Sequence, residues 1–420
     1  MTRVLIILII FNFIPVSQAQ WIKQCCDTSE YIRSIYFIDN NTGWAAGDNG
    51  KLYKTTNKGN DWVLLKNNPY YTLNGSIYFI NAFTGWLCDN ADYSYGIIRK
   101  TTNGGYNWNV IYYDFDKYLF YSLHFFDADT GFVLSVNNTS GWSILKTTNS
   151  GLNWEEKFQG HFLSSIYTLN KDTIWVSGGF SPGRILKTTN GGVTWITNYV
   201  QESDQLHSVY FINKDLGWTT GFGIRYVGVI LNTTDGGVTW FKQDSIYNNT
   251  PYTVQFTDVN TGYVSGVGFI IKTTNGGRKW AIENLDITIY SQFFLTNDFG
   301  WIAGGSILMT TSGGGQFTFK PEIFNLLQNY PNPFNGTTII KFEIPEEHNV
   351  YSRKCSIVLY DITGKKVKTL FDGYKLPGIY SIEFNSVNIS SGVYFYKLEV
   401  NSSKSSGLDY TETKKMVLVR

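Results

Sequence analysis

One eight-residue phrase recurs seven times between Thr55 and Phe317, and it constrains the fold more than any other feature of the chain. Each copy opens with Thr-Thr, continues with a short polar residue and a glycine at its fifth position, and ends in an aromatic residue. Successive copies start 37 to 46 residues apart. Such a period indicates a repeat architecture, in which each unit buries its apolar face against its neighbours. The third and eighth positions hold Asn57 and Trp62, Asn103 and Trp108, Asn149 and Trp154, Asn190 and Trp195, Asp235 and Trp240, Asn275 and Trp280, and Ser312 and Phe317.

The segments around each phrase have the composition of four short strands. In the first unit, residues 34–38, 44–47, 51–55 and 62–65 are rich in β-branched and aromatic residues. Polar turns containing glycine or asparagine separate them. Four antiparallel strands in each of seven units predict an all-β chain in which residues 20–320 form a seven-bladed β-propeller.

The repeated phrase is typical of a structural turn. An Asn or Asp side chain at the third position can accept hydrogen bonds from the backbone N–H groups that follow it. Glycine at the fifth position adopts a positive φ without steric cost, and the first Thr hydroxyl can close a second local bond. We expect the aromatic residue at the eighth position to lie across the blade and fill the gap to its neighbour.

The first 19 residues are predicted to be a secretory signal peptide. Arg3 precedes an apolar run from Val4 to Ile14, and Ser17-Gln18-Ala19 fits a cleavage site. The run is shorter than the roughly 20 residues that span a bilayer, so no membrane-spanning segment is expected. The net charge is +1 and no long run of Lys or Arg is present, which argues against a nucleic-acid partner.

Export would permit disulfides among Cys25, Cys26, Cys88 and Cys355. Adjacent cysteines rarely bond each other, but one of the first pair could bridge to Cys88. The alternative is that Cys88 is a small buried thiol, because other units carry Ala46 or Val264 at its position. No Cys-x-x-Cys spacing occurs and the four histidines are scattered, so we expect neither a metal nor a cofactor.

After Lys320 the repeat stops, and residues 321–420 are predicted to form a second domain. Short strands separated by turns suggest a small Ig-like β-sandwich. The expected strands are residues 339–344, 356–360, 378–380, 391–396 and 415–419.

The sevenfold phrase resembles the Asp-box, or bacterial neuraminidase repeat. The wider unit, with Thr42-Gly43-Trp44 and Thr84-Gly85-Trp86, resembles the repeats of photosystem II stability and assembly factor propellers, over about residues 21–320. In most copies Asn replaces Asp, which keeps the acceptor oxygen and loses the charge, so the turn is expected to persist without a cation site. The fourth unit also lacks the glycine before Trp175.

Four segments of the second domain resemble the C-terminal sorting domain of type IX secretion cargo. They are residues 329–335, 360–364, 391–394 and 414–420. The resemblance implies a bacterium of the Bacteroidetes kind, recognition of residues 321–420 by the type IX machinery, and an extracellular or outer-surface location. Whether the protein is released or anchored stays open, and the alternative is an ordinary sandwich that binds a partner.

Two segments compete to close the predicted ring. Residues 21–24 have the pattern of a fourth strand, as in residues 240–243, and they could pair with the last unit. Residues 317–319 could occupy the same edge. An unclosed ring would leave exposed strand edges, which is unfavourable.

The candidate binding residues come from the variable loops. In a propeller the regular turns after the first and third strands open on one face, and the loops after the second and fourth strands open on the other. Variable loops on a rigid scaffold commonly carry function, and aromatic faces near carboxylates suit sugars or extended peptides. We predict a site formed by Tyr93, Tyr95, Tyr113, Asp116, Trp142, Phe180, Arg225 and Tyr226. The alternative is that these side chains only cover blade edges.

The expected function is a secreted or surface-attached module that binds a polysaccharide or a protein and has no catalytic residues. The alternative is a sialidase-like enzyme or another glycoside hydrolase. A sialidase needs three converging arginines, and a hydrolase needs two carboxylates across a cleft. The available acids are Asp92, Asp114, Asp116, Glu202 and Asp204, and the propeller arginines are Arg33, Arg99, Arg184, Arg225 and Arg278. A photosystem assembly role would follow only from the repeats, and the two export signals oppose it.

Overall fold

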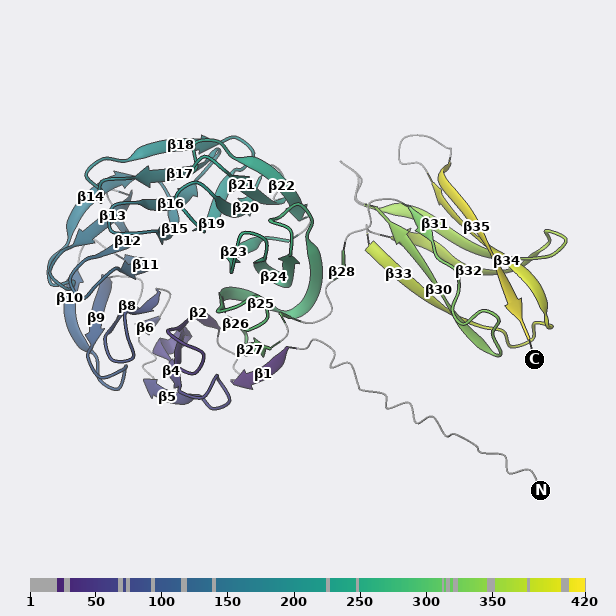
Figure 1. The fold of residues 1–420 in the computed structure, drawn as a ribbon, viewed down its shortest axis with the longest axis horizontal. Helices are drawn as coiled ribbons and strands as arrows, with labels where there is room; N and C mark the ends of the chain where they lie inside the picture. The colour runs from purple at the N-terminus through teal and green to yellow at the C-terminus, as the bar shows by residue number, and fades with distance from the viewer. Residues whose placement is uncertain are drawn as a thin grey trace, which may run out of the picture. The chain divides into compact units, whose positions relative to one another are not determined.

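The computed structural model divides into two compact units, residues 1–317 and 318–420 (Figure 1). It describes residues 21–25, 31–66, 71–72, 76–91, 95–114, 119–137, 141–223, 227–246, 249–311, 313–314, 318–319, 324–345, 352–375, 378–401 and 408–419. The described residues are almost entirely β-structure, with one short 3₁₀ turn, η1 (Asp48–Gly50).

The first unit is built from antiparallel sheets that follow the sequence repeats in order. Repeat one holds β2 (Ile32–Phe37), β3 (Gly43–Gly47), β4 (Leu52–Thr55) and β5 (Val63–Lys66). Repeat two holds β6 (Tyr71–Thr72), β7 (Ile77–Phe79), β8 (Gly85–Ala91), β9 (Tyr95–Thr101) and β10 (Asn109–Asp114). Repeat three holds β11 (Leu119–Phe125), β12 (Gly131–Asn137), β13 (Gly141–Thr147) and β14 (Glu155–Gly160).

Repeats four to seven continue the same arrangement. Repeat four holds β15 (Leu163–Thr168), β16 (Ile174–Gly179), β17 (Gly183–Thr188) and β18 (Ile196–Val200). Repeat five holds β19 (Gln205–Phe211), β20 (Gly217–Phe222), β21 (Gly228–Thr233) and β22 (Phe241–Ile246). Repeats six and seven share one strand path through β23 (Pro251–Phe256), β24 (Gly262–Thr273), β25 (Ala281–Phe294), β26 (Gly300–Gly304), β27 (Ile307–Thr310) and β1 (Ile22–Cys25).

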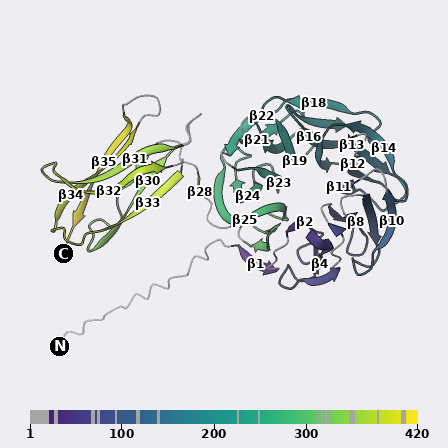
Figure 2. The same cartoon turned by 180° about the vertical axis from the view of Figure 1, so that it is seen from behind.

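The sheets of the first unit stand around a ring, as the two opposite views in Figures 1 and 2 show. The first strand of each repeat is innermost, as with β11, β15 and β19, and the fourth is outermost, as with β14, β18 and β22. This arrangement is that of a β-propeller.

Aromatic stacks join one repeat to the next. The aromatic side chain of the second strand lies flat on the phenylalanine that ends the first strand of the following repeat, with ring centroids 3.4 to 3.8 Å apart. The tryptophan at the eighth phrase position then meets the edge of that same phenylalanine, as Trp62 meets Phe37. The prediction that this tryptophan helps fill the gap is confirmed, and the flat stack is the larger contact that sequence reasoning missed. The stacked pairs are Trp44–Phe79, Trp86–Phe125, Trp175–Phe211, Trp218–Phe256, Tyr263–Phe294 and Trp301–Phe37.

The same phenylalanine explains the glycine that precedes the second-strand aromatic residue. A Cβ atom on Gly217 would lie 2.5 Å from the Phe211 ring, closer than any side chain tolerates. Repeat four lacks this pair of residues. It has Thr168 where the phenylalanine would be and Ile174 in place of the glycine. The missing glycine is therefore matched by a missing ring.

The repeated turns have the predicted chemistry. Thr55 Oγ1 accepts a hydrogen bond from the Gly59 N–H at 2.9 Å and donates to Asn57 Oδ1 at 3.0 Å. Asn57 Oδ1 also accepts the Asp61 N–H at 2.9 Å. Gly59 has a φ of 84°, which glycine adopts without strain. The same bonds recur in the next five copies. In the last copy Thr310 accepts the Gly314 N–H, and Ser312 and Phe317 lie outside the described residues.

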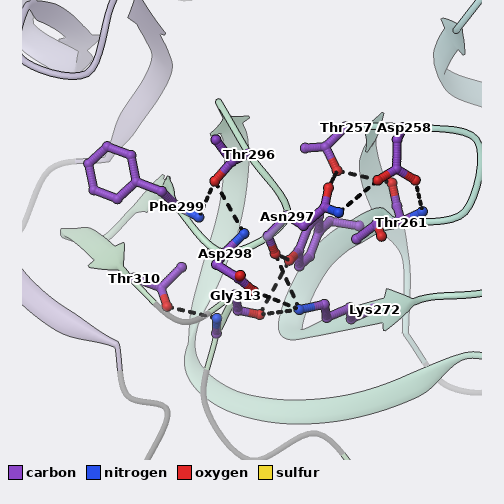
Figure 3. Close-up of polar contacts among 12 residues, drawn as sticks. Thr257, Asp258, Thr261, Lys272, Thr296, Asn297, Asp298, Phe299, Thr310 and Gly313 are labelled. Carbon is purple, nitrogen blue, oxygen red and sulfur yellow. Dashed lines mark hydrogen bonds and ion pairs between the residues drawn. The ribbon is translucent and has the colours of Figure 1, made fainter.

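Both regular turns of every repeat lie on one face of the ring. A backbone N–H of the phrase donates to a carbonyl of the turn after the first strand at 2.6 to 3.1 Å in all seven repeats, as in Gly104 N to Phe83 O. Side chains extend this network between repeats (Figure 3): Asn297 of repeat seven donates to Asp258 of repeat six at 2.7 Å, and Lys272 donates to Gly313 O. We call this side the regular face.

The N-terminal strand closes the ring. β1 pairs antiparallel with β27, and Ile22 stands opposite Met309. Trp21 donates from Nε1 to Glu283 at 2.9 Å. Across the same joint, Trp301 stacks on Phe37 at 3.4 Å and donates to Lys58 O. Of the two segments that the sequence left in competition for this edge, residues 21–24 are the one that pairs with β27.

The second unit contains two sheets that share one core. β28 (Thr318–Phe319) lies at its start. One sheet has the order β29 (Asn325–Leu326), β30 (Thr337–Ile344), β33 (Gly378–Asn385), and the other β32 (Lys366–Lys375), β31 (Arg353–Asp361), β34 (Gly392–Asn401), β35 (Leu408–Leu418). Apolar side chains of both sheets form the core, among them Phe342 and Leu398.

The segment from Gln328 to Phe334 binds along the C-terminal strand. Phe334 N donates to Val417 O at 3.0 Å, and Val417 N donates to Asn332 Oδ1 at 2.8 Å. Asn329 is buried and donates from its side-chain amide to Thr338 Oγ1 and to Pro331 O. The asparagines of this segment are therefore structural.

Cys88 and Cys355 are free and buried, so Cys88 is the small buried thiol of the second alternative. Cys26 and the side chain of Cys25 lie outside the described parts. Within the described ranges, no helix has the length and apolar character that crossing a membrane requires.

Candidate functional site

The strand registers place the candidate residues opposite the regular face. In repeat three, Gly131 pairs with Thr147 beside the regular turn, and Asn137 pairs with Gly141 at the far end of the same two strands. Trp142 therefore lies at the far end, where it also pairs with Gly160. We call this side of the ring the variable face.

Four aromatic side chains form a continuous row across repeats three and four on this face. Tyr121 and Trp142 have centroids 5.0 Å apart, Trp142 and Phe162 5.0 Å, and Phe162 and Phe180 4.8 Å. Phe180 is 61% exposed and the other three are half-buried. This aromatic row (Tyr121, Trp142, Phe162, Phe180) presents a connected apolar surface that ends in an open ring.

Backbone hydrogen bonds hold the Phe180 end of the row. Gly179 N donates to Phe162 O at 2.8 Å, Ser181 N to Asp204 O at 2.7 Å, and Gly183 N to Ser203 O at 2.7 Å. The Ser181 hydroxyl also donates to Asp204 Oδ1 at 3.0 Å. The loop between β16 and β17 is thereby joined to the loop before β19, so Phe180 is exposed on a supported loop.

A second aromatic group, called the mouth cluster below, lies at the variable-face ends of the inner strands. The Arg33 guanidinium lies 4.2 Å from the Tyr290 ring and 5.2 Å from the Tyr31 ring. Tyr290 stacks on Tyr252 at 5.7 Å, and Tyr252 contacts His207 at 5.6 Å. These five residues, the mouth cluster, come from the starts of first strands in repeats one, five, six and seven.

The charges in the mouth cluster are largely satisfied within the protein. Arg33 donates to both carboxylate oxygens of Asp48, at 2.9 and 3.2 Å. Burial opposes its charge, but the bonds to Asp48 and the proximity of Tyr290 leave the pKa of Arg33 raised. Burial lowers the pKa of His207 despite its bond to Pro251 O. Burial also raises the pKa of Tyr252. The cluster therefore offers mainly aromatic faces.

Tyrosines and one histidine lie on the first strands, nearer the regular face than the mouth cluster. Tyr36 contacts Tyr78 at 5.0 Å, Tyr78 contacts His124 at 4.3 Å, and Tyr167 contacts Tyr210 at 4.8 Å. Burial lowers the pKa of His124 to about 3, so its imidazole is neutral at ordinary pH. These side chains are half-buried and contact one another along the inner strands.

The structure brings together two of the eight predicted site residues. Trp142 and Phe180 belong to the same row, joined through Phe162. Tyr95 and Tyr113 lie on β9 and β10 of repeat two, with Tyr113 largely exposed. Tyr93, Asp116, Arg225 and Tyr226 lie outside the described residues.

Sequence reasoning missed Tyr121, Phe162 and the whole mouth cluster, because it considered loops and not the starts of the first strands. The sequence did contain a signal for most of these positions. Arg33, Tyr121, His207, Tyr252 and Tyr290 all lie four residues before the last residue of the first strand. Large side chains at one phase of a repeat indicate one ring of positions on the inner strands.

The charged groups considered for catalysis are dispersed among the described residues. Arg33 and Arg99 each form an ion pair within their own repeat, with Asp48 and with Asp89, and Lys66 of repeat one also reaches Asp89 at 2.7 Å. Arg278 belongs to a turn of the regular face. Among the acids, Asp204 is bonded to Ser181. The described parts of the chain contain no group of three His, Cys, Asp or Glu side chains arranged to hold a metal ion.

Comparison with known proteins supports the division into a propeller and a tail. Residues 328–408 match the family described as the secretion system C-terminal sorting domain. The resemblance of the second unit to secretion cargo is thus confirmed, and the domain indicates export to the cell surface or beyond. A comparison with curated protein sequences found no match.

Solved structures establish the fold of the first unit. "YCF48 bound to D1 peptide" is 21% identical with a TM-score of 0.55, covering 70% of this chain and 97% of that one. YCF48 from Cyanidioschyzon merolae is 16% identical with a TM-score of 0.54, covering 70% and 99%. The Niastella koreensis GH74 enzyme is 13% identical with a TM-score of 0.58, covering 96% and 75%. At these identities the likeness concerns the fold and not the activity.

Proposed function

We propose that the chain is an exported binding module that presents a ligand site on the variable face of its propeller and has no catalysis of its own. The observation that carries this proposal is the contrast between the two faces. On the regular face, the repeated polar groups bond to one another within each repeat. On the variable face, connected aromatic rings are left partly open, as at Phe180 and Tyr31.

The proposal includes two finer features of the fold that were predicted from the sequence, the number of blades and the type of sandwich. Seven blades are supported by two long strands: β24 occupies the second and third strand positions of repeat six, and β25 occupies the fourth position of repeat six and the first of repeat seven. The sandwich of the second unit is Ig-like. Aromatic surfaces with nearby carboxylates suit a polysaccharide or an extended protein segment.

The location follows from the tail. After removal of residues 1–19, the type IX machinery recognises residues 321–420 and delivers the propeller to the outer surface or the medium. A binder in that place meets polysaccharides and the proteins of neighbouring surfaces. The solved YCF48 structure holds a D1 peptide, so a peptide ligand is a reasonable second arm of any screen.

The experiment is a screen of the secreted chain against a glycan array and against surface proteins by pull-down, with a hydrolase assay on every glycan that binds. We expect binding without turnover. Turnover that disappears when Asp204 or Glu202 is replaced would make the chain a glycoside hydrolase, and no binding in either screen would remove the binding proposal.

A further inference from the structure

We infer that the aromatic row of repeats three and four binds a carbohydrate chain, with Phe180 as its open stacking surface and Arg184, on the strand that follows the Phe180 loop, as a hydrogen-bond donor. This inference rests on the proposed binding function and assigns the site and the ligand class. It differs from the predicted loop site, since only Trp142 and Phe180 are shared.

The first support is the geometry of the row. Its ring centroids follow one another at 5.0, 5.0 and 4.8 Å from the first strand of repeat three to the loop after β16. The apolar face of a sugar ring packs well against an aromatic ring. A row that spans two repeats can accommodate consecutive sugar units, whereas a single exposed ring would hold only one.

The second support is an unsatisfied donor at the same junction. Nε of Arg184 is buried and has no hydrogen-bond partner. Alternation along β17 places Arg184 on the same side as Leu186, which packs in the core shared with Trp142 and Phe158 of repeat three. Buried donors are nearly always paired in folded proteins, so we expect the guanidinium of Arg184 to shift when a ligand binds and to donate to a ligand oxygen.

The third support is an acceptor bonded to the loop that carries Phe180. The carboxylate of Asp204 receives the Ser181 hydroxyl on Oδ1. A carboxylate has acceptor sites on both oxygens and can take further hydrogen bonds. Aromatic rings together with a guanidinium donor in repeat four and a carboxylate acceptor in repeat five suit the alternating apolar faces and hydroxyl edges of a sugar chain.

A peptide fits the row less well. Peptides that bind as an added strand need an open sheet edge. The variable face is made of strand ends and loops, and the outermost strands of the ring, such as β14 and β18, lie at its periphery. The choice of carbohydrate thus rests on the aromatic rings and the polar groups named above, and a peptide docked on the same rings is the other outcome of the test.

The test uses the full secreted chain and a defined panel of cellohexaose, xylohexaose, mannohexaose and galacturonic acid oligomers, together with a glycan array. Affinities are measured by calorimetry for the wild type and for Phe180→Ala and Arg184→Met. Phe241→Ala is the matched control, because Phe241 is a phenylalanine 62% exposed on the outer strand β22. Phe180 is exposed, so its replacement should leave the fold intact.

We expect at least one glycan to bind, and each of the two row variants to weaken it by about tenfold or more, with the control unchanged. A glycan that binds equally well to Phe180→Ala and Arg184→Met but is lost in Tyr252→Ala would overturn the row and assign the mouth cluster. Binding of a protein and of no glycan would overturn the carbohydrate class while keeping the binding function. No binding of any glycan or protein would contradict both the carbohydrate inference and the proposed binding function.

Discussion

Repeat four has Thr168 and Ile174 where repeat five has Phe211 and Gly217. Copying this pair into repeat five tests whether the phenylalanine ring is the reason for the glycine. The change is Phe211→Thr with Gly217→Ile, which copies Thr168 and Ile174. Gly217→Ile alone should cost about 3 kcal/mol, the upper end for overpacking, because its Cβ would lie 2.5 Å from the Phe211 ring. That ring cannot move aside, since it stacks on Trp175 at 3.8 Å and meets the edge of Trp240.

Phe211→Thr alone should cost about 4 kcal/mol, because a fully buried ring is lost from the stack. The double variant removes the ring that the isoleucine would hit. We therefore expect its cost to fall about 2 kcal/mol short of the sum of the two single changes, which is a coupling of the size seen for residues in direct contact.

The measurement is denaturant unfolding of the four proteins, followed by tryptophan fluorescence. All 13 tryptophans precede residue 302, so the signal reports the first unit and not the second. Costs that simply add, within about 0.5 kcal/mol, would refute the claim that the phenylalanine ring dictates the glycine.

Three further predictions follow from the joints and turns. Trp301→Phe should keep the stack on Phe37 but lose the bond to Lys58 O, lowering the stability of the first unit by about 1 kcal/mol in the same unfolding assay; no change would show that the closing hydrogen bond is unimportant. Burial opposes the charge of Asp235, but bonds from Thr239 and neighbouring groups hold its pKa at about 2. Its folded pKa is below the unfolded value, so its contribution is present above about pH 4 and is lost as the pH falls toward 2; the melting temperatures of wild type and Asp235→Asn should converge over that range, and a constant difference would contradict this. Asn329→Ala should destabilise the second unit by about 2 kcal/mol, because buried partners are left unsatisfied, and cell fractionation should show less secreted protein; unaltered secretion would separate this residue from export.

The repeats explain why much of the fold was predictable. Thr55, Asn57 and Gly59 act within a few residues of one another, so their hydrogen bonds could be derived from local chemistry. The strand pattern of residues 21–24 made them one of two candidates for closing the ring, and the choice between the two required the structure. The export tail was predictable for the same reason, since its motifs follow one another in order along the chain.

The aromatic row was only half predictable, because its contacts depend on how two repeats meet. Phe162 is adjacent to a first strand and not part of a long loop, and nothing in the sequence indicates that its ring lies between Trp142 and Phe180. Asp48, the partner of Arg33, is 15 residues away and is the first residue of the 3₁₀ turn that follows β3. The relation between Gly217 and Phe211 likewise requires the ring position, which depends on Trp175 of the preceding repeat.

The most direct test of the division between the two faces is hydrogen exchange of the full secreted chain with and without a glycan found in the screen. We predict slower exchange at residues 141–142, 161–163 and 179–184, and no change in the repeated turns. Protection confined to those turns, with the variable face unaffected, would contradict the account.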